Sequence, residues 1–171
     1  MSSRTTLFWL GLFALVVLLS VRGGGLLGRN EDDRLRASVG GRVVRVVDGD
    51  TVVVQRGGQI EKVRYIGVDT PESVKPGTPV QCFSKAAAAA NRRLVLGRAV
   101  RLVPDAEARD RYGRSLFYVY RASDGLFVNA ELVREDYART MTIPPNVAHA
   151  GDFRRLATTA RRAGRGLWSR C

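Results

Sequence analysis

The chain has 171 residues, with 28 lysine and arginine residues against 16 acidic ones and a net charge of +12 at pH 7. Arginine supplies 25 of the 28 basic side chains, and its planar guanidinium group pairs well with phosphate. A genome rich in G and C would explain the preference for arginine but not the size of the positive excess, which favours a polyanionic partner such as nucleic acid. The single histidine argues against histidine-based phosphoryl transfer.

The first forty residues differ from the rest in composition. Residues 5–21 are seventeen uncharged, mostly apolar residues, at the short limit for a spanning helix and slightly long for the apolar part of a signal peptide. We therefore interpret residues 1–22 as a signal peptide or a membrane anchor, and residues 23–39 as a flexible linker. Residues 40–171 then form one domain, since they are too few for two.

Three runs rich in valine and other strand-forming residues predict the first strands, at residues 41–47, 51–56 and 61–66. Gly57-Gly58 separates the second run from the third and predicts a two-residue hairpin turn. With this turn, antiparallel register sets Thr51 opposite Arg64 and Asp50 opposite Tyr65. The side chains of Asp50 and Arg64 are then expected within reach of each other.

The remaining pattern predicts two more strands, at residues 99–103 and 116–120, and three helices, at residues 84–96, 129–135 and 148–163. Ser84 and Asn129 are residue types that cap helices, and we expect each to cap the helix that it begins. His149 is expected at the surface or in the first turn of the last helix. Five strands with few helices predict a small barrel, mainly β in an α+β fold.

Three clusters combine acids with arginines: Val-Asp-Gly-Asp-Thr at 47–51, Arg-Tyr-Ile-Gly-Val-Asp-Thr-Pro-Glu at 64–72, and Asp-Arg-Tyr-Gly-Arg at 110–114. Carboxylates such as those of Asp50 and Asp69 can hold a hard cation, and Glu72 can activate water. Arg64 and Arg114 can bind a phosphate whose negative charge grows in the transition state. Together the clusters contain what phosphodiester hydrolysis needs.

Each cluster also has a simpler explanation. Arg114 of the third cluster could be an ordinary solvated arginine. Asp48 before a glycine is typical of a turn, and the sequence at 69–72 is also typical of a turn or a helix cap. Asp69 lies four residues beyond the partner of Asp50, about 13 Å along a straight strand. One cation reaches both carboxylates only if the chain bends, and Gly67 could relieve such a bend.

In their order and spacing, the three clusters resemble the thermonuclease (staphylococcal nuclease-like) family, over roughly residues 41–168. The resemblance implies a five-stranded OB-fold barrel with three helices and a calcium-dependent nuclease. Asp50 and Asp69 would supply carboxylate ligands to Ca²⁺, and Thr70 its backbone carbonyl. Glu72 would orient and deprotonate the attacking water. Oxygen ligands without histidine or cysteine also suit Ca²⁺ better than zinc.

The resemblance also implies how the substrate is held. Arg64 and Arg114 would bind the phosphate oxygens during hydrolysis, and Arg111 and Tyr112 fall where the family contacts a terminal phosphate of the nucleotide. The chain departs from the family at the tyrosines that pack on the nucleotide, because the corresponding positions are not aromatic and fall near Thr142 and Pro144.

The two cysteines are Cys82 and Cys171. Inside a cell they would be free thiols, whereas an exported chain with an even pair is expected to form a disulfide. A metal site on cysteine is disfavoured, because no Cys-x-x-Cys spacing is present. We favour export, secreted or membrane-anchored, because calcium is plentiful outside cells, and we therefore predict the Cys82–Cys171 disulfide.

Two functions from different classes remain. The first is a monomeric, calcium-dependent phosphodiesterase that acts on DNA and RNA. The second is a non-catalytic OB-fold module that binds nucleic acid at the cell surface. A binding module gains nothing from the carboxylates of Asp50, Asp69 and Glu72, which repel phosphate unless a cation lies among them. The carboxylates therefore favour the enzyme.

Overall fold

The computed structural model describes residues 37–72, 77 and 79–171. Its strands are β1 (Val39–Val46), β2 (Thr51–Arg56), β3 (Gln59–Tyr65), β4 (Val68–Asp69), β5 (Ala99–Val103), β6 (Ser115–Arg121) and β7 (Arg139–Thr140). Its helices are α3 (Ser84–Val95), α4 (Val128–Arg134), α5 (Ala150–Arg162) and the single turn α6 (Leu167–Arg170). The proposed signal peptide or anchor and most of the proposed linker lie outside the described residues.

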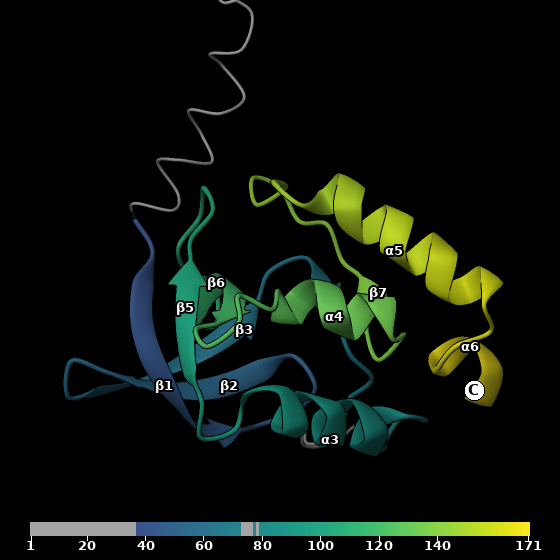
Figure 1. Cartoon of the computed structure of the whole chain (residues 1–171), viewed down its shortest axis with the longest axis horizontal. Coiled ribbons are helices and arrows are strands. Elements are labelled where there is room, and N and C mark those ends of the chain that lie inside the picture. Colours follow the sequence, from purple (N-terminus) through teal and green to yellow (C-terminus); the bar gives the residue numbers. More distant parts are fainter. Residues whose placement is uncertain (1–36, 73–76, 78) are drawn as a thin grey trace, which may run out of the picture. The chain divides into compact units, whose positions relative to one another are not determined.

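Five strands form a closed barrel in the order β1-β2-β3-β6-β5 (Figure 1). All neighbouring pairs are antiparallel except β3 and β6, which run parallel. The strands β4 and β7 form a separate two-stranded sheet beside the barrel. This arrangement confirms the predicted five-stranded OB-fold barrel with three helices.

The predicted hairpin between β2 and β3 is confirmed. Gly57 and Gly58 have φ of 54° and 80°, a region that glycine enters without steric cost. Thr51 pairs with Arg64 as expected, and the N–H of Tyr65 donates to the carbonyl oxygen of Asp50 at 2.9 Å. The local hairpin therefore fixes the relative positions of Asp50 and Arg64.

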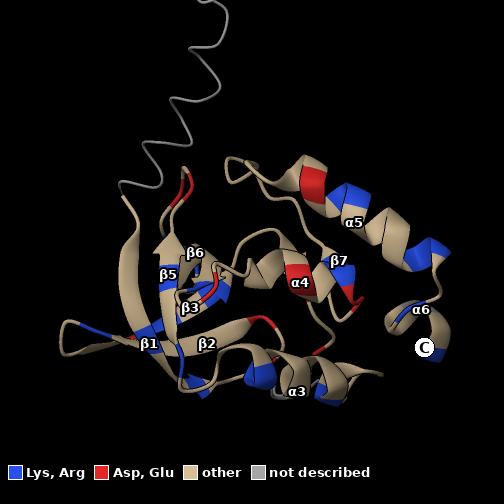
Figure 2. Cartoon of the chain, in the orientation of Figure 1, with Lys and Arg blue, Asp and Glu red and all other residues tan. Residues whose placement is uncertain are grey.

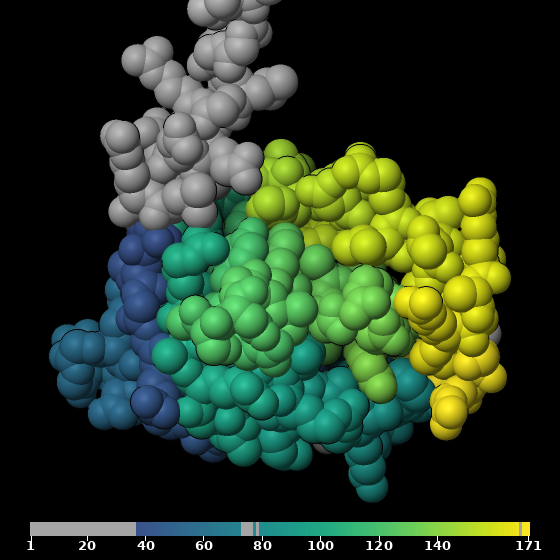
Figure 3. Space-filling view, in the orientation of Figure 1, coloured from purple at the N-terminus to yellow at the C-terminus, as the bar shows by residue number. Residues whose placement is uncertain are grey.

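The barrel interior is filled mainly by small β-branched side chains. Valines from β1, β2, β3 and β5 are fully buried, together with Tyr65, Tyr118 and Leu102. Helix α4 packs on this core through Leu132, and α5 packs through Phe153. In the space-filling view, the yellow C-terminal segment lies against the green atoms of α4 (Figure 3).

The helix positions agree with the sequence prediction, but both predicted caps are wrong. The N-cap of α3 is Phe83, at φ 68°, and Ser84 is the first helical residue, with a buried hydroxyl that has no hydrogen-bond partner in the described chain. The N-cap of α4 is Phe127. Asn129 is instead fully buried, where it accepts from the N–H of Val119 and donates to the carbonyl oxygen of Ile66, both at 2.9 Å.

Basic residues occur on β1, β3, α3 and α5 (Figure 2). The positive charge is therefore spread over several elements of the domain rather than confined to one helix. Among the described residues, no helix combines the length and apolar character needed to cross a bilayer.

Candidate active site

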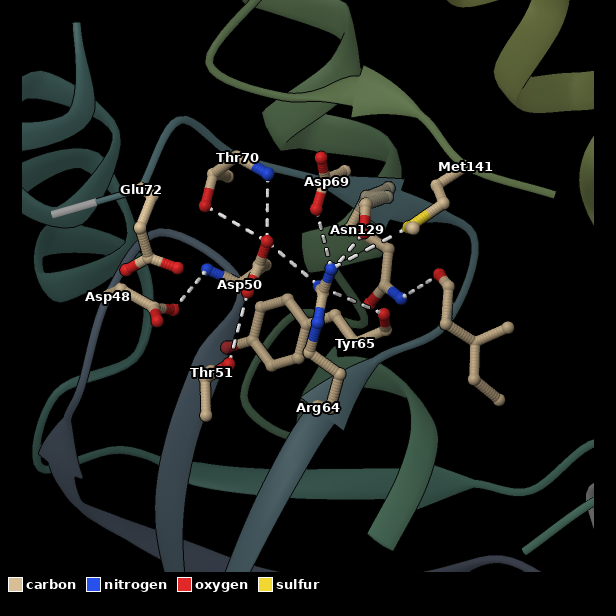
Figure 4. A network of polar contacts seen from close by, with 12 residues as sticks. Asp48, Asp50, Thr51, Arg64, Tyr65, Asp69, Thr70, Glu72, Asn129 and Met141 are labelled. Atoms are coloured by element: carbon tan, nitrogen blue, oxygen red, sulfur yellow. Dashed lines mark hydrogen bonds and ion pairs between the residues drawn. The ribbon is translucent and has the colours of Figure 1, made fainter. Parts of the chain in front are cut away.

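Asp50 lies at the centre of a polar network that joins the turn after β1 to the turn after β3 (Figure 4). Its side chain is almost completely buried. Oδ2 accepts hydrogen bonds from the backbone N–H of Thr70 at 2.7 Å and from its hydroxyl at 2.9 Å. Oδ1 accepts from the hydroxyl of Thr51 at 3.0 Å. Such charge-assisted bonds fix the carboxylate in one orientation.

The turn that carries Asp50 is shaped by its neighbours. The Asp48 carboxylate accepts from the N–H of Asp50 at 3.1 Å, which is the turn geometry that the sequence predicts for Asp-Gly. A Cβ on Gly49 would lie 2.6 to 2.7 Å from side-chain atoms of Thr70. Only glycine at position 49 lets Thr70 approach Asp50 so closely.

Arg64, at the end of β3, links both predicted metal-binding carboxylates. Nη1 lies 2.8 Å from Oδ2 of Asp50 and donates to the carbonyl oxygen of Val68 at 2.9 Å. Nη2 donates to Oδ1 of Asp69 at 2.9 Å and lies 3.9 Å from Sδ of Met141. The guanidinium group thus lies between two acids, as Figure 4 shows.

The bend that the sequence requires is present at Gly67. This residue has φ 80°, and the chain turns there before it enters β4, which pairs with β7. The turn brings Asp69 back to Arg64 although the two are five residues apart. Asp69 remains half exposed, with 52% of its side chain accessible, so it is open to a ligand from solvent.

Glu72 follows the same turn and is partly buried. Its backbone N–H donates to Oε1 of Gln81 at 2.8 Å, and its carbonyl oxygen accepts from the N–H of Gln81 at 2.9 Å. Glu72 is near enough to Asp69 to contribute to the raised pKa of that group.

The acids of the site carry perturbed pKa values. Burial, followed by the charge of Asp50, raises the pKa of Asp48 to about 6. Burial also raises the pKa of Asp69. The charge of Arg64 lowers this pKa, but burial and the charges of Asp50 and Glu72 together outweigh Arg64. Burial is thus the larger cause of both raised pKa values, and neighbouring carboxylates add to it.

The donor set fits a hard cation. The carboxylates of Asp50 and Asp69 and the backbone carbonyl of Thr70 are oxygen donors, which Ca²⁺ prefers. A cation would offset the part of the raised Asp69 pKa that comes from the charges of Asp50 and Glu72. In the described part of the chain, no three His, Cys, Asp or Glu side chains are already grouped around one point. Occupation would thus require side chains such as Asp69 and Glu72 to adjust.

Arg114 is held by the loop that precedes β6. Its Nε donates to Oδ2 of Asp110 at 2.6 Å, and Oδ1 of Asp110 accepts from the N–H groups of Tyr112 and Arg114, both at 2.9 Å. Burial by itself raises the pKa of Asp110, but these hydrogen bonds outweigh it and lower that pKa. The Arg111 and Arg114 guanidinium groups lie 4.9 and 5.4 Å from the centre of the Tyr112 ring.

These residues meet at a cleft of about 480 Å³. Arg64, Arg111, Tyr112 and Arg114 all line it, so the cleft is suited to an anion with an organic part. The residues that line it do not include Asp50, Asp69, Thr70 or Glu72. Arg64 connects the cleft to the acidic residues, because it lines the cleft and contacts Asp50 and Asp69.

The segment after β7 lines the cleft with aliphatic rather than aromatic side chains. The lining residues are Met141 and Ile143, on either side of Thr142, together with Asn146. Thr142 and Pro144, which the sequence comparison placed near the family's nucleotide-packing tyrosines, are not among them. The part of the cleft wall that this segment supplies is therefore apolar apart from Asn146 and has no aromatic ring on which a base could stack.

Sequence reasoning missed the residues that fix the site from a distance. Asn91 of α3 is fully buried, accepts from the Tyr65 hydroxyl at 2.9 Å and donates to the carbonyl oxygen of Asp48 at 3.0 Å. Gln81 holds the backbone of Glu72. The only available signal was an asparagine within an alanine-rich helix, and nothing distinguished Gln81.

Residues 62–170 match the family model described as staphylococcal nuclease homologue. The thermonuclease of Staphylococcus intermedius is 39% identical over 159 residues, which cover 92% of this chain and 92% of that protein. The thermonuclease of Staphylococcus hyicus is 38% identical over 75% of both chains. The endonuclease YncB of Bacillus subtilis is 38% identical over 74% of this chain and 60% of its own length.

Proposed function

Because the chain belongs to the staphylococcal nuclease family and is similar to two thermonucleases, we propose that it is a calcium-dependent nuclease that cleaves DNA and RNA. The observation that carries the proposal is the position of Arg64, which contacts Asp50 and Asp69 and also lines the arginine-rich cleft. A site for a cation and a site for a phosphate thus share one side chain.

We assign the metal ligands to Asp50, Asp69 and the backbone carbonyl of Thr70. A bound Ca²⁺ would supply positive charge that stabilises the phosphate in the transition state. Asp50 is already fixed by Thr70 and Thr51, which reduces the cost of ordering this ligand. Asp69 is half exposed and can change from Arg64 to the cation.

We assign the general base to Glu72. Its carboxylate would accept a proton from the attacking water as the water oxygen bonds to phosphorus and the bond to the leaving oxygen breaks. Arg64 and Arg114 would donate to the phosphate oxygens, whose charge grows during this step. Asp110 orients Arg114 through the bond at 2.6 Å, while Arg111 and Tyr112 would contact a terminal phosphate.

The alternative is a non-catalytic module that binds nucleic acid. Three carboxylates near the cleft would weaken such binding unless a cation offsets them. Neighbouring carboxylate charges add to the effect of burial in raising the pKa values of Asp48 and Asp69, and a cation would offset that added repulsion, so we favour the enzyme.

We further propose that the protein is exported, secreted or membrane-anchored, and acts as a monomer. The structure contains a disulfide between Cys82 and Cys171, and structural disulfides are typical of oxidising compartments. Residues 1–22 would direct export as a signal peptide or anchor.

The function can be tested by hydrolysis of single-stranded DNA and of RNA with Ca²⁺, with Mg²⁺ and with EGTA. We expect cleavage with Ca²⁺ and none with EGTA. Glu72→Gln keeps the shape of the side chain but removes the proton acceptor, so the rate should fall about 10²-fold or more. The matched control is Glu135→Gln, which removes a partly exposed carboxylate that is paired with Arg134 and Arg165.

Three outcomes would contradict parts of this proposal. Full activity in EGTA would rule out the calcium requirement. A folded Glu72→Gln variant with the parental rate would rule out Glu72 as the base. Tight binding of nucleic acid without any hydrolysis would favour the non-catalytic module.

A further inference from the structure

One side chain outside the catalytic clusters holds the backbone of Glu72. Two hydrogen bonds join Glu72 to Gln81, which lies nine residues further along the chain. The Gln81 amide oxygen Oε1 accepts from the N–H of Glu72 at 2.8 Å, and the N–H of Gln81 donates to the Glu72 carbonyl oxygen at 2.9 Å. Both polar groups of the Glu72 backbone are therefore bound by a single residue.

Glu72 needs such support because it lies in no helix or strand. On its N-terminal side the chain is fixed two residues earlier, where Thr70 binds Asp50 through its N–H and its hydroxyl. On its C-terminal side the corresponding attachment is Gln81. A displacement of about 1 Å in a catalytic group can cost up to 10²-fold in rate, so both attachments matter for a base.

The bond from the Glu72 N–H to the Gln81 side chain is exposed to solvent, and water competes with bonds of this kind. The two bonds can hold Glu72 in place only if Gln81 is itself fixed. Its carbonyl oxygen accepts from the N–H of Ser84 at 3.1 Å, which ties Gln81 to the first residue of α3.

Two stronger attachments follow directly in the sequence. Cys82 is joined by a disulfide to Cys171, with the Cα atoms 6.0 Å apart. The ring of Phe83 stacks on that of Tyr137, with centroids 5.5 Å apart. Gln81 is therefore adjacent to a covalent link between the start of α3 and the segment after α6.

We propose that Gln81, anchored by the Cys82–Cys171 disulfide, is a positioning residue that holds Glu72 at the site. This inference rests on the proposed role of Glu72 as the base. Gln81 is not among the residues that line the cleft, and it acts through the backbone of Glu72. The disulfide thus supports catalysis as well as stability.

The kinetic test is Gln81→Ala in the full chain, with Ca²⁺ and single-stranded DNA. We expect kcat to fall about 10-fold with KM changed less than about 2-fold, because substrate is bound by the cleft and not by Gln81. Gln81→Glu keeps an acceptor oxygen at the same reach and should restore most of kcat. The matched control is Val80→Ala, which truncates the neighbouring side chain, 58% exposed, and should leave both constants unchanged.

A second measurement reports position without turnover. Hydrogen exchange of the Glu72 amide, followed by NMR, should be faster in Gln81→Ala and also in the double variant Cys82→Ser/Cys171→Ser, whereas the Thr70 amide should keep its protection. Circular dichroism would show that all variants are folded.

The two measurements separate this inference from the proposed function. Parental kcat in Gln81→Ala, or unchanged exchange of the Glu72 amide, would overturn the positioning role. The proposed function would be refuted by an inactive parent or by a Glu72→Gln variant that is as active as the parent. In either case, exchange of the Glu72 amide would still show whether Gln81 holds Glu72.

Discussion

Asp48 carries a strongly perturbed carboxylate near the proposed metal ligands, although we assign it no catalytic role. It accepts from the N–H of Asp50 at 3.1 Å, and burial together with the charge of Asp50 raises its pKa to about 6 from 3.8. A raised pKa means that the folded state binds this proton more tightly than the unfolded state. The ionised form therefore destabilises the metal-free protein at neutral pH.

The sign of the pH dependence follows from this shift. Without metal, stability should rise as the pH falls from about 7 towards 4, because Asp48 becomes protonated in the folded state first. Asp48→Asn keeps an acceptor for the Asp50 N–H and removes the charge, so it should stabilise the metal-free protein at pH 8 by about 1 to 3 kcal/mol. At pH 4 Asp48→Asn should be no more stable than the parent, because Asp48 is then already protonated in the folded state. Thermal unfolding in EGTA across this pH range measures both effects.

Calcium provides the control for this prediction. If the cation binds near Asp48, it should offset the negative charge and reduce the advantage of Asp48→Asn. Equal stability of parent and variant in EGTA at pH 8 would show that the ionised carboxylate is tolerated without cost.

At the residue scale, sequence reasoning succeeded where the geometry was local. The pairing of Thr51 with Arg64 followed from the hairpin turn, and it fixed Asp50 beside Arg64. The prediction from sequence failed for Asn129, which was expected to cap a helix but instead joins Val119 to Ile66 through hydrogen bonds. Residue type alone cannot distinguish an asparagine that caps a helix from a buried asparagine that joins two segments, because in both cases the side chain hydrogen-bonds to backbone groups.

At the scale of elements, the turn after β3 and the helix α5 fit together at one point. A Cβ on Gly67 would lie 2.3 Å from an atom of the Phe153 ring, and Phe153 is fully buried. Gly67 also has φ 80°. The absence of a side chain at this position lets α5 pack against the turn that returns Asp69 to Arg64.

Gly67→Ala should therefore be destabilising for two separate reasons. The positive φ costs about 1 to 2 kcal/mol for a residue with a Cβ, and displacement of the Phe153 ring adds about 1 to 3 kcal/mol. The matched control is Gly58→Ala, which has the same φ of 80° and no atom within 4 Å of the added Cβ. The difference between the two variants in urea denaturation isolates the packing contribution. Equal losses would mean that Phe153 moves aside without cost.

The elements that sequence reasoning missed are the shortest ones. β4 and β7 have two residues each, and α6 has four. Periodicity needs more residues than this before it separates a strand or helix from a loop. The small sheet exists because the bend at Gly67 places Val68 beside Thr140. This pairing joins residues that are far apart in the sequence, so local patterns do not predict it.

At the scale of the whole molecule, the disulfide closes a long loop. Cys82 and Cys171 are 89 residues apart, so the link removes much of the freedom of the unfolded chain. In the chain-entropy picture this stabilises the fold by up to about 4 to 5 kcal/mol. We expect reduction, or Cys82→Ser/Cys171→Ser, to lower the midpoint of urea unfolding clearly, and non-reduced peptide mapping should show the Cys82–Cys171 link in exported protein. Two free thiols there, or an unchanged midpoint after reduction, would contradict this.

The parallel pairing of β3 with β6 has a consequence for the time before folding is complete. It sets Arg64 opposite Leu116, two residues beyond Arg114, and so brings together two arginines that are fifty positions apart in the chain. Until β6 docks, the first half of the domain has the carboxylates and one arginine but no cleft. A chain in which β6 is not yet paired with β3 would thus lack the cleft in which we propose that the phosphate binds. Closure of the barrel is therefore the step that completes the proposed active site.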